Sequence, residues 1–96
     1  MIVMRKNPYV STQTVSATWQ EYVFPTFVKT LILSNKTPAT GDINVRTVDP
    51  GPASTEVGLT LGAAGGLQTR TLDNVAVKRV QFKGAVGASL YIEGWH

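Results

Sequence analysis

The chain has no cysteine and only one histidine, His96. Without cysteine, no disulfide can hold the fold together and no thiolate can act as nucleophile or metal ligand. With histidine only at the last position, no imidazole can be placed beside a serine or threonine to activate it. No apolar run approaches the roughly 18 residues of a membrane-spanning helix. These absences exclude thiol chemistry and argue against hydrolytic chemistry and a membrane span.

Acidic residues are few and dispersed, and they are outnumbered six to nine by lysine and arginine, for a net charge of +3. No two carboxylates have a spacing that marks a hydrolase, and metal sites need ligands that converge. Basic residues never form a run longer than two, so they read as solubilising charge rather than a phosphate-binding patch. We therefore predict a protein that is not an enzyme, that has no metal or cofactor, and that binds neither nucleic acid nor membrane.

Long helices are not expected either, because glycine or proline interrupts every stretch that could form three helical turns. Short segments of alternating polarity, separated by turn residues, instead indicate an all-β fold. We predict one small β-sandwich of about eight short antiparallel strands, jelly-roll or Greek-key like, with the immunoglobulin-like alternative open. The expected strands are residues 9–16, 19–24, 27–34, 42–48, 57–61, 67–72, 77–83 and 88–93.

Proline and alternation predict several details of these strands. Pro25 lacks an amide hydrogen and is expected to end the second strand. The next segment, 27–34, is the most apolar and predicts a central strand with Leu31 and Leu33 on one face. Ile43 and Val45 are expected to point inward in the same way. Residues 49–55 and 62–66 predict a loop and a turn.

The last two strands predict a β-hairpin. A three-residue loop, 85–87, would align Phe82 with Leu90 on an apolar face and put Gly87 at the left-handed loop position. The opposite face would carry Tyr91 and Trp95, and Arg79 would oppose Glu93.

Residues 1–8 predict an N-terminal arm in front of a sandwich domain of residues 9–96. The apolar start of the arm can add a strand at a sheet edge or dock on a neighbouring subunit, and both readings stay open. Trp19 is expected in the core. For Trp95, a core position and a surface position are given equal weight. The predicted interface consists of Ile2, Val3, Met4, Arg5, Tyr91 and Trp95.

Four segments carry a resemblance: a polar strand that ends near Trp19, the run Leu31-Ile-Leu-Ser-Asn-Lys-Thr37, the strand Ile43-Asn-Val-Arg46, and a closing stretch from Val77 to the sequence Ile92-Glu-Gly-Trp95. Together they resemble small virion proteins of tailed bacteriophages. The resemblance spans most of the chain and implies a structural part of the particle, such as a head decoration (cement) protein. No catalytic motif is carried over with it.

This resemblance implies a virion location after synthesis in the host cytoplasm, and the N-terminus lacks the pattern of a secretory signal. The implied partners are the major capsid protein or other virion proteins. A homo-oligomer is expected, with a trimer favoured. The alternative is a carbohydrate-binding module that stacks sugar rings on Trp19, Tyr22 or Trp95. An adaptor that binds peptides at a sheet edge is a third class.

Overall fold

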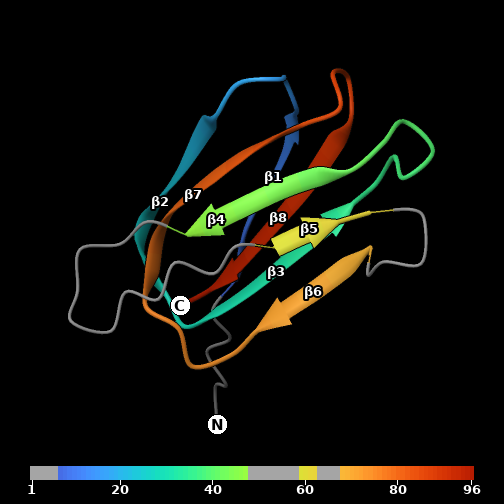
Figure 1. Ribbon diagram of the computed structural model, residues 1–96. Coiled ribbons are helices and arrows are strands. Elements are labelled where there is room, and N and C mark those ends of the chain that lie inside the picture. The colour runs from blue at the N-terminus through green and yellow to red at the C-terminus, as the bar shows by residue number, and fades with distance from the viewer. Residues whose placement is uncertain (1–6, 48–58, 63–67) are drawn as a thin grey trace, which may run out of the picture.

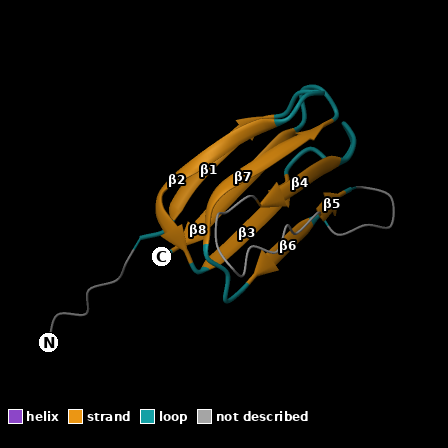
Figure 2. Ribbon diagram, turned by 60° about the vertical axis from the view of Figure 1, so that its left-hand side comes forward, coloured by secondary structure: helices purple, strands orange, loops and turns teal. Residues whose placement is uncertain are grey.

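The computed structural model describes residues 7–47, 59–62 and 68–96 of the chain. Within them, eight strands form two four-stranded antiparallel sheets that pack face to face. Figure 2 shows the two layers, with both sheets tilted in the same direction. The predicted fold class, an all-β sandwich of about eight short antiparallel strands, is confirmed.

Each sheet combines strands from distant parts of the chain. The first, sheet A, has the order β1-β8-β3-β6, and the second, sheet B, has the order β2-β7-β4-β5. The strands of sheet A are β1 (Tyr9–Thr14), β8 (Ser89–Trp95), β3 (Thr30–Asn35) and β6 (Thr69–Leu72). Those of sheet B are β2 (Gln20–Val28), β7 (Val77–Gly84), β4 (Ile43–Thr47) and β5 (Leu59–Leu61).

The strand order is that of a jelly roll. Strand β1 pairs with β8, β2 with β7, β3 with β6 and β4 with β5. The chain therefore behaves as one long antiparallel ribbon that is folded over itself, so that successive pairs lie in alternate sheets (Figure 1). An immunoglobulin-like order, which the sequence left open, is not the one observed.

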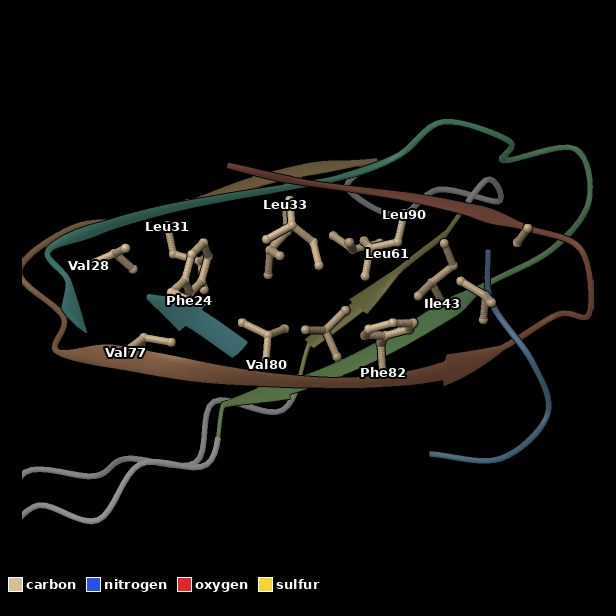
Figure 3. Packing of buried hydrophobic residues seen from close by; sticks show 14 residues of the cluster. Phe24, Val28, Leu31, Leu33, Ile43, Leu61, Val77, Val80, Phe82 and Leu90 are labelled. Atoms are coloured by element: carbon tan, nitrogen blue, oxygen red, sulfur yellow. The ribbon is translucent and has the colours of Figure 1, made fainter. Parts of the chain in front are cut away.

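The core lies between the sheets and takes one side chain in two from each strand. Figure 3 shows Leu31, Leu33 and Leu90 from sheet A facing Val80 and Phe82 from sheet B. Phe24 and Phe82 are the largest of the fully buried side chains. Burial of Leu31, Leu33, Ile43 and Val45 confirms the inward faces predicted for their strands.

The predicted hairpin between β7 and β8 is wrong. Strand β7 lies between β2 and β4, and β8 lies between β1 and β3, so the two strands belong to opposite sheets. Arg79 consequently opposes Val23, and Glu93 opposes Val10 and Ile32. Alternation identified the apolar faces correctly, but it cannot say whether two apolar faces lie side by side or face each other across a core.

The turn between these strands is nevertheless close to the predicted one. The amide of Ala88 donates to the carbonyl of Ala85 at 3.1 Å, and Gly87 has a φ of 86°. A left-handed conformation of this kind favours glycine. Gly87 also donates its amide to the carbonyl of Val15, which ties this turn to the connection between β1 and β2.

Pro25 does not end β2, contrary to the sequence prediction. The strand continues through it to Val28, with a shift of register between Val23 and Val28. Strand β2 is an edge strand, where a missing amide hydrogen breaks no ladder on the open side. The predicted strand 27–34 is instead divided at Lys29, where the chain passes from sheet B to sheet A.

A buried amide closes the end of the sandwich at which β3 leads into β4. Asn35 donates from Nδ2 to the carbonyls of Gly41 and Leu61, at 2.9 and 3.1 Å. Its Oδ1 accepts from the amide of Thr37, and the hydroxyl of Thr37 accepts from the amide of Ser89. Asn35 and Thr37 of the run 31–37 are thus structural residues that satisfy backbone groups.

The loop predicted at 49–55 lies outside the described residues, as do positions 63–66 of the predicted turn and positions 57 and 58 of the fifth expected strand. Residues 1–6 of the predicted arm also lie outside them.

Candidate functional site

The outer face of sheet A carries the two aromatic residues that were predicted to form a contact surface. On β8, Leu90, Ile92 and Gly94 point into the core, so alternation turns Tyr91, Glu93 and Trp95 outward. The hydroxyl of Tyr91 donates to Glu93 Oε1 at 2.6 Å. The indole Nε1 of Trp95 donates to Glu93 Oε2 at 2.7 Å. One carboxylate therefore fixes two aromatic side chains on either side of it.

These hydrogen bonds set the charge state of the group. The bond from Tyr91, followed by that from Trp95, lowers the pKa of Glu93, and partial desolvation opposes them. The same bond raises the pKa of the Tyr91 hydroxyl, with desolvation and the Glu93 charge acting in the same direction. At neutral pH the group is an ionised carboxylate held by two neutral donors. Such a group suits electrostatic contact better than proton transfer.

Apolar side chains flank this carboxylate on the neighbouring strands. Val10 of β1 and Ile32 of β3 lie directly opposite Glu93. Val10 is 51% exposed and Trp95 is 41% exposed. We call Val10, Ile32, Tyr91, Glu93 and Trp95 the aromatic face. It combines fixed aromatic rings with exposed aliphatic surface, a composition typical of the centre of a protein interface.

The other residues of the predicted interface, Ile2, Val3, Met4 and Arg5, lie outside the described residues. A common interface of these four residues with Tyr91 and Trp95 therefore stays a prediction. His96, which was set aside as a terminal residue, stacks on Tyr9 with ring centroids 4.7 Å apart. Its Nε2 lies 3.2 Å from the carbonyl oxygen of Asn7.

The prediction that Trp19 belongs to the core is wrong. Trp19 is 37% exposed, and the largest fully buried side chains are instead the two phenylalanines Phe24 and Phe82. Space in the core is tight beside Phe24, since a Cβ at Gly94 would already lie 2.5 Å from its ring. Trp19 lies outside sheet B, at the start of β2.

Sequence reasoning missed a second cluster, on the outer face of sheet B. The guanidinium carbon of Arg46 lies 3.9 Å from the centroid of the Trp19 ring, and the Nζ of Lys83 lies 4.7 Å from it. Alternation alone could have placed Arg46 outward, between Ile43 and Thr47 on a strand whose inward residues were recognised. It could not have shown that β7 lies beside β4, which is what brings Lys83 to the same place.

Within the described ranges, no cluster of three or more histidine, cysteine, aspartate or glutamate side chains could hold a metal ion. The same residues include no helix that is long and apolar enough to cross a bilayer.

Comparison with known proteins adds no family to these observations. No protein-family model matches the chain, and a search of curated proteins gives no match. Function is therefore inferred from the two outer faces.

Proposed function

We propose that the chain is a non-enzymatic structural virion protein of a tailed bacteriophage, and that it decorates or cements the head shell as a symmetric oligomer. The proposal starts from the resemblance of its strand and turn segments to small virion proteins. The jelly-roll strand order is compatible with it, since viral capsid domains use this fold. Lectin domains use the same fold, so the fold does not choose between a protein partner and a sugar.

The observation that carries the proposal is the state of the polar atoms on the aromatic face. Tyr91 Oη and Trp95 Nε1 both donate to Glu93, so their polar atoms already have partners before anything docks. A protein interface favours aromatic side chains that can be buried without leaving a donor unsatisfied. The hydroxyls of a sugar need protein donors and acceptors that are still available.

Binding at many equivalent positions would make modest contacts sufficient. On a symmetric shell, an oligomer engages several sites at once, and the second contact forms at a high effective concentration. In this role the aromatic face and the arm of residues 1–8 supply contacts to neighbouring subunits or to the shell.

The experiment is co-sedimentation of the purified protein with head shells assembled without it. We expect the double variant Y91A/W95A to lose shell binding, because it removes both aromatic rings that flank Glu93. The matched control is V23A/F27A, which shortens two exposed apolar side chains on β2 of the opposite sheet. Loss of binding by both pairs, or by neither, would contradict the assignment of the contact to the aromatic face.

The arm is tested separately by deleting residues 1–6, which keeps Asn7 and its contact with His96. We expect the fold to be retained, as judged by circular dichroism, and shell binding to be lost. Binding equal to that of the full chain would remove the arm from the proposal.

Carbohydrate binding is the second candidate, and the exposure of both tryptophans favours it. Solvent-accessible indole rings can stack on sugar rings. A titration with oligosaccharides, followed by tryptophan fluorescence, distinguishes the two candidates. Saturable binding that is lost in W19F or W95F would favour the module over the virion protein.

A further inference from the structure

The outer face of sheet B gathers positive charge from strands that are distant in sequence. Arg46 is on β4, whereas Arg79 and Lys83 are on β7, two and six residues after its start. On β7 these residues alternate with the buried Val80, so Arg79 and Lys83 both point away from the core. Trp19, Arg46, Arg79 and Lys83 form what we call the basic face.

Trp19 holds two of these cations in place. It directly precedes β2, and β7 lies between β2 and β4 in the sheet. Its indole therefore extends across β7 to reach the guanidinium of Arg46, and the ammonium of Lys83 lies against the same ring. Cation–π contacts of this kind reduce the freedom of long side chains that would otherwise sample many rotamers.

A row of side-chain hydrogen bonds also orients Arg46. Its Nε donates to Gln81 Oε1 at 2.6 Å, and Gln81 Nε2 donates to Glu21 Oε2 at 3.0 Å. These three residues are cross-strand neighbours on β4, β7 and β2. The amide of Gln81 thus lies between the carboxylate and the guanidinium. Glu21 helps to orient Arg46 through Gln81. Among the residues that the structure describes on this face, three cations, Arg46, Arg79 and Lys83, stand against the one carboxylate of Glu21.

We propose that the basic face is a docking surface for a protein surface rich in carboxylates. This goes beyond the proposed function, because the basic face lies on the sheet opposite the aromatic face and would hold a different partner. Charge complementarity carries the inference: guanidinium and ammonium groups that are already ordered lose little entropy when carboxylates approach. An arginine also offers a planar fork that fits a carboxylate.

A nucleic acid fits this surface less well. Proteins that bind single strands combine positive charge with aromatic rings on which bases stack. The ring of Trp19 already has a guanidinium and an ammonium group against it, at 3.9 and 4.7 Å from its centroid. A base that stacked on the part of the ring occupied by these cations would have to displace them first.

The test uses poly-L-glutamate as the acidic probe and the fluorescence of Trp19 as the signal. All proteins carry W95F, so that Trp19 is the only tryptophan of the two that remains. We expect saturable binding at low ionic strength that weakens as salt is added. The variant R46Q/K83Q should bind about tenfold more weakly. The matched control K29Q/K36Q removes two positive charges elsewhere in the chain and should bind almost as well as the parent protein.

Because R46Q also alters the bond to Gln81, the single variant K83Q is measured as well, and circular dichroism checks the fold of each variant. K83Q should weaken binding by roughly two- to fivefold. Equal weakening in K29Q/K36Q would show that only net charge matters and would overturn the proposal. A single-stranded dT20 oligonucleotide that binds more tightly than poly-L-glutamate through Arg46 and Lys83 would overturn it in favour of nucleic acid. Absence of poly-L-glutamate binding at low salt would also overturn it.

Discussion

At the scale of single residues, side chains that look alike in the sequence have unlike roles. Asn35 is 3% exposed and satisfies three backbone groups, whereas Asn44 is partly exposed and accepts a bond from the hydroxyl of Thr60. Trp19 and Trp95 both lie at the surface, but one contacts two cations and the other donates to a carboxylate. In each of these two comparisons the residue type is the same, and the groups that each side chain contacts determine its role.

Replacing Asn35 with alanine should destabilise the fold by roughly 1–3 kcal/mol, because the carbonyls of Gly41 and Leu61 would lose a buried donor. The measurement is the free energy of unfolding from a urea titration. The control is N44A on β4, for which we expect a change within about 0.5 kcal/mol. Equal losses in the two variants would show that Asn35 does not stabilise the fold through its buried bonds.

The Tyr91–Glu93–Trp95 group predicts a dependence on acid pH. The folded state lowers the pKa of Glu93, chiefly through the bond from Tyr91. The resulting stabilisation is fully present above the unfolded pKa of glutamate, about 4.3, and is lost as pH falls through the lower folded pKa. The indole N–H resonance of Trp95 should therefore shift below about pH 4, and this transition should be absent in E93Q.

The Tyr91 hydroxyl predicts a dependence on alkaline pH. Its pKa is raised in the folded state, first by the bond to Glu93, so the neutral phenol is favoured. This contribution is present below the unfolded pKa of tyrosine, about 10, and is lost as pH rises through the higher folded pKa. A Tyr91 that ionises below the pKa of free tyrosine would contradict the hydrogen-bonded arrangement.

At the scale of strands, the close approach of β8 to β2 in the opposite sheet depends on Gly94. A Cβ at Gly94 would lie 2.5 Å from a ring atom of Phe24 and 2.6 Å from a methyl carbon of Val28, both on β2. The core has no room for this extra carbon next to fully buried side chains. The sequence Ile92-Glu-Gly-Trp95 thus combines two inward positions that pack the core with two outward positions on the aromatic face.

The variant G94A should therefore lose roughly 1–3 kcal/mol of stability through overpacking. The double variant G94A/F24L makes room for the methyl group, so its loss should be smaller than the sum of the two single losses. Thermal or urea unfolding of the four proteins measures this coupling. Strictly additive losses would show that Gly94 and Phe24 do not compete for the same space.

At the scale of the whole molecule, the two sheets present outer faces of different chemistry. The aromatic face surrounds one carboxylate with aromatic and aliphatic side chains, and the basic face carries Arg46, Arg79 and Lys83. Two faces on opposite layers allow one small domain to contact two partners at once. This property would suit a protein that links neighbouring units of a shell.

Solution mass is the prediction that belongs to this scale. If the protein forms the trimer that the proposed function favours, light scattering on a sizing column should give three times the 10.3 kDa mass of one chain. We expect Y91A/W95A to reduce this mass if the aromatic face joins the subunits, and to leave it unchanged if that face contacts only the shell. A monomer at every concentration would contradict a stable oligomer in solution.

The sequence by itself determined the fold class, the inward side of most strands and the outward position of Tyr91. Alternation and turn residues carry this information locally, so Leu31, Ile43 and Phe82 could be assigned to the core without knowledge of their neighbours. The left-handed Gly87 was predictable in the same way, because the turn requires a conformation that glycine adopts readily.

Only the tertiary structure decided which strands lie side by side. Because the ribbon of strands is folded over itself, β7 and β8 lie in opposite sheets, Trp19 lies at the surface, and Arg46 lies near Lys83. The physical reason is that hydrophobic burial is non-directional. The apolar face of a strand is buried against the opposite layer whichever strands lie beside it in its own sheet, so the choice of neighbours depends on how all eight strands fill one volume together.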